Sequence, residues 1–156
     1  MEGLTLPGPP GLAKGWDLGH SEGMETTKNP ALLAASLAGF TGVALGAFGA
    51  HALQAFLSAQ ALTWWQTAVD YHLVHAVVLV AVALGLKPGV CRAVAVAGLV
   101  GGVALFSGSL YVLALTGEKG WGLVTPLGGV SFLVGWGAIG WAAWKQTPLY
   151  RTPSDQ

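Results

Sequence analysis

Charge and cysteine are both scarce in this sequence. Only 9% of the 156 residues are Asp, Glu, Lys or Arg, whereas soluble globular domains carry about 25%. The formal net charge is zero, so the chain lacks a basic surface for nucleic-acid phosphates, and we expect no nucleic-acid partner. The single cysteine, Cys91, excludes an internal disulfide and a metal site built from thiolates alone. So little charge cannot solvate a water-facing surface, which indicates a protein of the lipid bilayer.

The motifs of soluble enzymes are missing as well. The sequence has no G-x-S-x-G elbow, no phosphate-binding G-x-x-x-x-G-K-[ST], no H-E-x-x-H and no G-x-G-x-x-G after a strand. Ser107 and Ser109 flank Gly108, but serine in a membrane helix usually bonds to backbone or to a neighbouring helix. We therefore expect a protein that is not an enzyme, and we assign it no catalytic residue, cofactor or metal ligand.

What the chain does have is long uncharged runs. At 1.5 Å per residue, about 20 apolar residues cross a hydrocarbon core of about 30 Å. The runs predict an all-α, integral membrane four-helix bundle within residues 31–146, with spans at about 31–53, 67–86, 93–116 and 125–144. We expect a turn or surface-lying segment at 54–66, with Trp64 and Trp65 in the interfacial aromatic belt. Because Asp70 falls in the first turns of the second span, a re-entrant or tilted segment is the alternative there.

Polar sequence at both ends sets the predicted domain limits and topology. Residues 1–30 read as a mobile, Gly/Pro-rich polar tail that is not cleaved, and residues 147–156 as a short polar C-terminal tail. Basic residues near short loops favour the cytoplasmic side. Six basic residues lie in the two tails and in the loop between the second and third spans, whereas the other two loops contain only Lys119. This distribution predicts that both termini are cytoplasmic. The six are Lys14, Lys28, Lys87, Arg92, Lys145 and Arg151.

Small residues recur at helical spacing. Gly42, Gly46 and Ala50 repeat every four residues, and Gly98 and Gly102 do the same in the third span. Such stripes let helix backbones approach closely in lipid. We interpret them as packing surfaces within the bundle, with an interface to a partner protein or to a second copy as the alternative.

The polar residues inside the spans are the candidate functional residues. With the predicted topology, every one of them falls near the outer end of a span, although they come from four separate segments. The set is His51, Asp70, Tyr71, His72, His75, Ser107, Ser109, Tyr111 and Thr125.

Three interpretations of this polar cluster stay open. It can be a set of hydrogen bonds that fastens the bundle, in which Asp70 reaches the interface or accepts a bond from an imidazole or a tyrosine hydroxyl. It can be a pathway for protons or a small solute. It can also bind haem or a metal ion, because two or three histidines with one aspartate suit either, although the i, i+3 spacing of His72 and His75 is not a specific metal signature.

Four segments of the sequence also resemble a known family. They are GAFGAHAL from residue 46, TAVDYHLVHA from 67, ALFSGSLYVLALTG from 104 and TPLGGVSFLVGW from 125. Together they are similar to the small inner-membrane proteins of domain-of-unknown-function family 423, the YgdD-like group, over about residues 31–144. The resemblance implies a compact four-span protein of the bacterial inner membrane without an established activity. It does not account for the long segment before Ala31.

We therefore expect a multi-pass inner-membrane protein that acts as a structural or accessory subunit. Its partners are the lipid bilayer and other integral membrane subunits or a second copy, as the glycine-rich faces indicate. A small proton-coupled transporter or proton-conducting module is the alternative function, and haem or metal binding a lower one.

Overall fold

A computed structural model describes residues 28–145 of the chain. Within these residues the helices are α1 (Pro30–His51), α2 (Ala59–Gly85), α3 (Val90–Gly102), α4 (Gly108–Thr116) and α5 (Thr125–Lys145). Short 3-10 helices, Leu53–Ala55 and Lys119–Leu123, lie in two connections. The predicted tails, 1–30 and 147–156, lie outside the described residues except for Lys28, Asn29 and Pro30.

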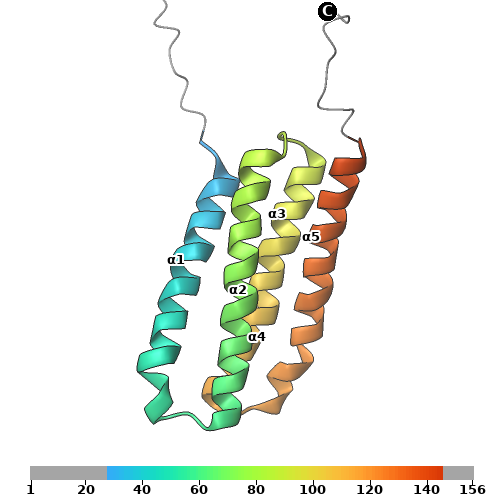
Figure 1. Ribbon diagram of the computed structural model, residues 1–156. Coiled ribbons are helices and arrows are strands. Elements are labelled where there is room, and N and C mark those ends of the chain that lie inside the picture. The colour runs from blue at the N-terminus through green and yellow to red at the C-terminus, as the bar shows by residue number, and fades with distance from the viewer. Residues whose placement is uncertain (1–27, 146–156) are drawn as a thin grey trace, which may run out of the picture.

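The helices run up and down in four antiparallel segments (Figure 1). Each segment is long and apolar enough to cross a membrane: Pro30–Ala55, Ala59–Gly85, Val90–Thr116 and Lys119–Lys145. The predicted four-span, all-α architecture is therefore confirmed. The start of α1 and the end of α5 lie at one end of the bundle, here called the terminal end, and the connections 52–58 and 117–124 lie at the far end. Which end faces the cytoplasm stays a prediction.

Local sequence explains where the helices begin and end. Asn29 caps α1 by accepting a hydrogen bond from Leu32 N at 3.2 Å, and Pro30 occupies the first turn. Ser58 caps α2 by accepting from Ala61 N at 3.2 Å. Gly117 ends α4 in the left-handed conformation, with φ of 71°, which glycine adopts without steric cost.

The start of α2 corrects the predicted second span. Residues 59–66 are the first turns of this 27-residue helix, not a turn or a surface-lying segment. The cap at Ser58 starts the helix there, and neither proline nor glycine interrupts it before Gly85. Trp65 consequently packs inside the bundle with 3% of its surface exposed, so it does not face the lipid as a residue of the aromatic belt would.

The third span is one continuous helical segment with an irregular middle. Between α3 and α4, Val103–Ser107 form a π-helix. A π-bulge widens the helix by one residue and changes the direction of the side chains that follow. This irregularity places Ser107 and Tyr111 in the interior, with 0% and 9% of their surface exposed.

The core divides into two clusters along the bundle axis. The cluster toward the terminal end is aliphatic apart from Phe132 and comprises Ala35, Leu79, Val82, Ala95, Leu99 and Phe132. The cluster toward the far end contains aromatic rings and comprises Leu53, Ala61, Trp65, Ala68, Val69, Leu110, Tyr111, Leu113 and Ala114.

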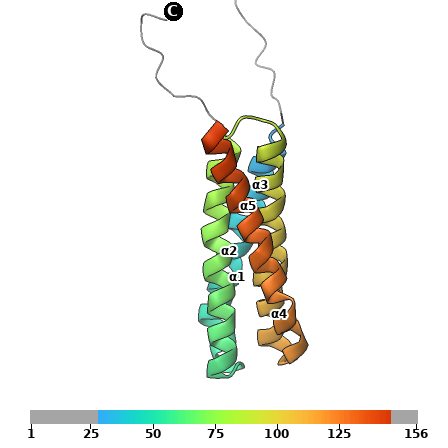
Figure 2. The same ribbon diagram turned by 90° about the vertical axis from the view of Figure 1, so that its right-hand side faces the viewer.

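Two helix pairs are packed tightly by glycine, α1 with α2 and α3 with α5. A Cβ added at Gly98 would lie 2.6 Å from Gly135 N, and one at Gly102 would overlap the Phe132 ring. Figure 2 shows α5 running obliquely beside α3. On α1, added Cβ atoms at Gly42 and Gly46 would lie 2.8 Å from Leu73 Cδ2 and 3.2 Å from Val69 Cγ1.

Ala50 does not take the predicted place in this stripe. It is exposed, whereas its neighbour Gly49 is buried against the Trp65 ring. The helical period explains the difference. With 3.6 residues per turn, a buried face alternates between steps of four and three residues, so it passes from Gly42 to Gly46 and then to Gly49 instead of Ala50.

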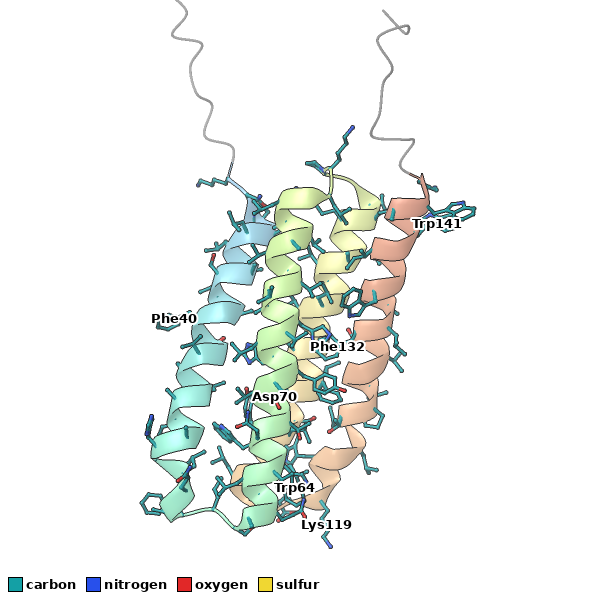
Figure 3. All side chains as sticks on the ribbon, in the orientation of Figure 1. Phe40, Trp64, Asp70, Lys119, Phe132 and Trp141 are labelled. Carbon is teal, nitrogen blue, oxygen red and sulfur yellow. The ribbon has the colours of Figure 1, made fainter. Side chains whose placement is uncertain are left out.

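The outer surface of the bundle is largely apolar. Phe40 is 76% exposed and points away from the bundle (Figure 3). In the apolar stretches of the first and fourth segments, only 17% of the residues are buried within the bundle. Acyl chains are the solvent that suits such a surface.

Candidate functional site: a polar layer at the middle of the bundle

Contacts between the spans show at what depth in the bundle the predicted polar residues lie. Gly42 lies against Leu73, Gly102 lies against Phe132, and the His75 ring stacks on the Phe132 ring with centroids 3.6 Å apart. These residues are close to the midpoints of their four segments. The midpoints therefore share one level, and His72 and His75 belong to the middle layer of the bundle.

His72 connects three helices within this layer. The ring is buried, its Nε2 lies 3.3 Å from Thr41 Oγ1 of α1, and its Nδ1 lies 3.4 Å from Tyr111 OH of α4. A neutral imidazole has one donor and one acceptor, and each hydroxyl can take either role. Both ring nitrogens of His72 thus have polar neighbours without a carboxylate.

His75 is held by three separate interactions. Its Nδ1 lies 2.7 Å from the carbonyl oxygen of Tyr71, which can only accept, so this nitrogen carries the proton and donates. Its Nε2 then accepts from Trp136 Nε1 of α5 at 3.4 Å. With one donating and one accepting nitrogen, the ring matches the neutral tautomer, and its stacking on Phe132 fixes its plane.

Asp70 lies on the opposite side of α2 from this interior. Its side chain is exposed and accepts a hydrogen bond from Gln66 Nε2 at 2.7 Å. The expected hydrogen bond to an imidazole or a tyrosine hydroxyl was wrong, because the partner is Gln66. The alternative, that Asp70 reaches the interface, stays a prediction. Asp70 is the twelfth residue of the 27 in α2, about 16 Å from the start of the helix at 1.5 Å per residue.

Four other candidates of the set lie beside the layer or toward the far end. Tyr71 is 44% exposed, and its ring stacks on Phe106 at 4.3 Å. Ser109 Oγ donates to Phe106 O at 3.0 Å and lies 2.8 Å from Thr125 Oγ1, which joins α4 to α5. Ser107 Oγ is buried without a hydrogen-bond partner within residues 28–145.

His51 does not join the other histidines. It is the last residue of α1 at the far end and is exposed. The predicted cluster at the outer end is therefore spread over several depths. His72 and His75 lie near the middle, and the Tyr111 hydroxyl reaches His72 from the far half of the bundle. The Ser109–Thr125 pair also lies in the far half, and His51 lies at the far end. The error follows from the predicted start of the second span, because the eight additional residues at its beginning move His72 and His75 to mid-depth.

Sequence reasoning missed several residues of the polar layer. Trp65 Nε1 donates to Leu45 O at 3.0 Å, and its ring packs on Tyr111 with centroids 4.7 Å apart. Trp65, His72 and Leu79 are seven residues apart and share one face of a helix that begins at Ala59. That spacing was a usable signal, whereas nothing in the sequence singles out Thr41 or Trp136 as a partner of a histidine.

The chemistry available to these residues is hydrogen bonding between uncharged groups. Within residues 28–145 no three His, Cys, Asp or Glu side chains come together in a group that could hold a metal ion. Asp70 and the two buried histidines point to different sides of α2.

Comparison with known proteins places the chain in a family. The family described as "Protein of unknown function (DUF423)" matches residues 45–129. The chain belongs to the DUF423 family. The resemblance to this family that the four sequence segments indicate is thereby confirmed.

DUF423 relatives of this chain are membrane proteins by name. The UPF0382 membrane protein of Haemophilus influenzae is 39% identical over 123 residues, covering 78% of this chain and 99% of the relative. The UPF0382 inner membrane protein YgdD of Escherichia coli K12 is 45% identical over 111 residues, covering 67% of this chain and 82% of the relative. The UPF0382 membrane protein YwdK of Bacillus subtilis is 45% identical over 106 residues, covering 66% of this chain and 86% of the relative. No solved structure matches the chain. This DUF423 protein is a multi-pass protein of the bacterial inner membrane.

Proposed function

We propose that this protein is a non-enzymatic accessory subunit that packs against a different integral membrane protein through α2. The observation that carries the proposal is the position of Asp70. A carboxylate near the centre of a membrane helix costs about 3 kcal/mol on insertion scales unless it is paired or reaches water. Here its partner among the described residues is the Gln66 amide, which neutralises no charge.

The surroundings of Asp70 form a continuous surface for a partner helix. An exposed stripe follows one face of α2 through Thr63, Gln66, Asp70, Val74, Val77, Ala81 and Leu84. A partner that brings a basic or hydrogen-bond-donating side chain to Asp70 would compensate the carboxylate within the bilayer. A symmetric dimer across this face would instead bring two carboxylates together, so we commit to a heteromeric partner.

Photocrosslinking on the α2 stripe tests the proposal. A crosslinking side chain at Val74, 57% exposed, should give an adduct with another integral membrane protein that carries a basic or donor residue in a span. Asp70→Ala should reduce that adduct at least fivefold, while Thr63→Ala, on the same stripe near its end, should not. A crosslinker at Phe40 on α1 is the positional control. An adduct that survives Asp70→Ala, a self-adduct alone, or recovery solely as a free monomer after gentle solubilisation would overturn the proposal.

A proton-conducting module is the second candidate. The mid-depth position of His72 and His75, each with polar neighbours, is the arrangement that favours it. Against it, the core toward the terminal end is apolar, with Leu79 and Leu99 fully buried. Proton flux in proteoliposomes should fall in His75→Ala and not in His51→Ala if the module conducts.

A further inference from the structure

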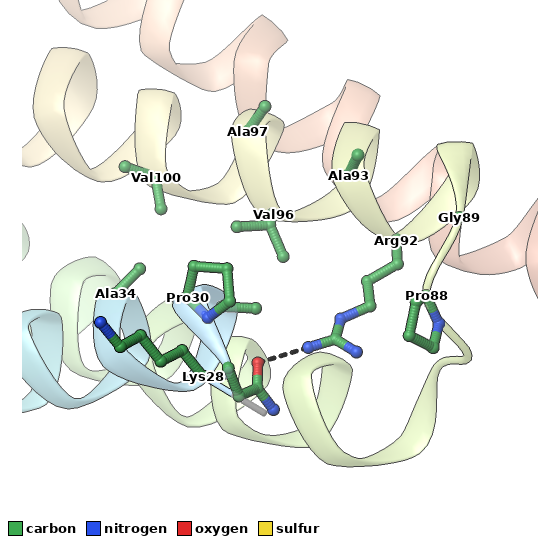
Figure 4. Close-up of a pocket in the computed structure, with 12 residues that line it drawn as sticks. Lys28, Pro30, Ala34, Pro88, Gly89, Arg92, Ala93, Val96, Ala97 and Val100 are labelled. Carbon is green, nitrogen blue, oxygen red and sulfur yellow. Dashed lines mark hydrogen bonds between the residues drawn. The ribbon is translucent and has the colours of Figure 1, made fainter. Parts of the chain in front are cut away.

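A groove opens between α1 and α3 at the terminal end of the bundle. Its volume is about 790 Å³, within the range of small-molecule sites. Its walls are small and apolar, with Pro30, Ala31 and Ala34 on one side and Val96, Ala97 and Val100 on the other (Figure 4). Pro88 and Gly89, in the turn between α2 and α3, also line it.

The mouth of this groove is cationic. Lys28 and Arg92 both line it. The Arg92 guanidinium donates to Asn29 Oδ1 (Figure 4). It also donates to Leu86 O at 3.5 Å, and both acceptors are uncharged. Within residues 28–145 the acidic side chains are Asp70, near the middle of α2, and Glu118, at the far end. Neither is placed to neutralise the groove.

Charge and apolar surface are arranged in the order in which a phospholipid presents its parts. Lys28 and Arg92 lie at or before the first turns of α1 and α3, where the spans enter the bilayer. Val96 and Val100 lie one and two turns deeper. Arginine at this level binds phosphate oxygens through its planar fork of donors, and basic pockets between spans are suited to anionic head groups.

We propose that this groove binds one anionic phospholipid, with its phosphate on Arg92 and one acyl chain along Ala34, Val96 and Val100. Asn29 is a positioning residue, because its side chain both caps α1 and holds the guanidinium at the mouth. The proposal is independent of the partner surface on α2. The competing occupant is the N-terminal segment of the chain itself, since Glu22 and Glu25 precede Lys28 in the sequence.

Native mass spectrometry and thermal melting of the purified full chain test the proposal. Phosphatidylglycerol should bind and raise the melting temperature more than phosphatidylcholine does, and inorganic phosphate should do neither. Arg92→Gln, which keeps a donor for Asn29 and Leu86, should weaken phosphatidylglycerol binding about fivefold, because one basic residue near the surface is worth about 1 kcal/mol. Ala97→Phe, which fills the groove without changing charge, should weaken binding of both lipids.

Lys145→Gln is the matched control. Lys145 is an exposed cation at the same end, but its Nζ lies 5.1 Å from the Trp141 ring, outside the groove. Three results would overturn the proposal: equal binding of the two lipids, an effect of Lys145→Gln as large as that of Arg92→Gln, or equal stabilisation by inorganic phosphate. A preference for phosphatidylglycerol that appears only after Glu22→Gln and Glu25→Gln would assign the groove to the N-terminal segment instead.

Discussion

The two glycine-packed interfaces of the bundle differ in what the glycines face. Between α3 and α5, an added Cβ at Gly98 would meet backbone: Gly135 N at 2.6 Å, Gly135 Cα at 2.8 Å and Ser131 O at 2.9 Å. Between α1 and α2, added Cβ atoms at Gly42 and Gly49 would meet side chains, those of Leu73 and Trp65. Gly98 thus brings backbone against backbone in the α3–α5 pair, whereas Gly42 and Gly49 of α1, like Gly102 of α3 beneath the Phe132 ring, lie under side chains.

This difference determines how each interface can respond to change. A side chain can leave its rotamer at a cost of about 1 kcal/mol, whereas a helix backbone moves only as part of the whole helix. The α3–α5 interface is therefore the rigid half of the bundle. The α1–α2 interface can adjust, and α1 also lines the groove that it shares with α3 at the terminal end.

The largest effect is expected for Gly98→Ala. The new methyl group would push α5 away from α3 along the region between Ser131 and Gly135, and overpacking of this kind costs about 3 kcal/mol. We expect a large fall in the melting temperature of the purified protein in detergent. Gly137→Ala, also on α5 but with nothing within 4 Å of its added Cβ, should melt like the parent. Equal melting of the two variants would show that the backbones are not in close contact.

A smaller effect is expected for Gly42→Ala. Its methyl group would meet the far end of Leu73, with Cδ2 at 2.8 Å and Cγ at 3.3 Å, and Leu73 can change rotamer. The loss should stay near 1 kcal/mol. Gly39→Ala on the same helix, with open space around the added Cβ, is the control. If Gly42→Ala destabilises the bundle as much as Gly98→Ala does, the two interfaces are equally rigid and the comparison fails.

Much of this fold follows from the sequence, because the bilayer requires long apolar helices of a known length. The four spans, their order and the glycine positions Gly42, Gly98 and Gly102 could be predicted. The beginning of α2 could not be predicted from hydropathy alone. Thr63, Gln66 and Asp70 make its first half look like an interfacial segment, while the Ser58 cap and the buried Trp65 show one continuous helix.

The site was harder to predict than the fold because depth errors accumulate along a helix. A shift of eight residues moves a side chain by about 12 Å, which is the difference between the membrane surface and its middle for His72. The direction of a side chain is equally sensitive, since Asp70 and His72 are two residues apart and point to opposite sides. The π-helix that turns Ser107 and Tyr111 inward has no signature in the sequence.

The smallest effect is expected for Ser131→Ala, which tests how much a hydrogen bond, as distinct from close backbone contact, stabilises the α3–α5 interface. Ser131 Oγ donates to Gly98 O at 2.8 Å, across the interface. Interhelical side-chain bonds in membranes contribute about 0.6 kcal/mol on average, so Ser131→Ala should lower stability by that amount. Ser36→Ala, whose hydroxyl bonds to Leu32 O of its own helix, should change it less. Because Ser131→Ala leaves the backbone approach intact, a loss as large as that of Gly98→Ala would mean that the hydroxyl, not the glycine contact, holds α3 to α5.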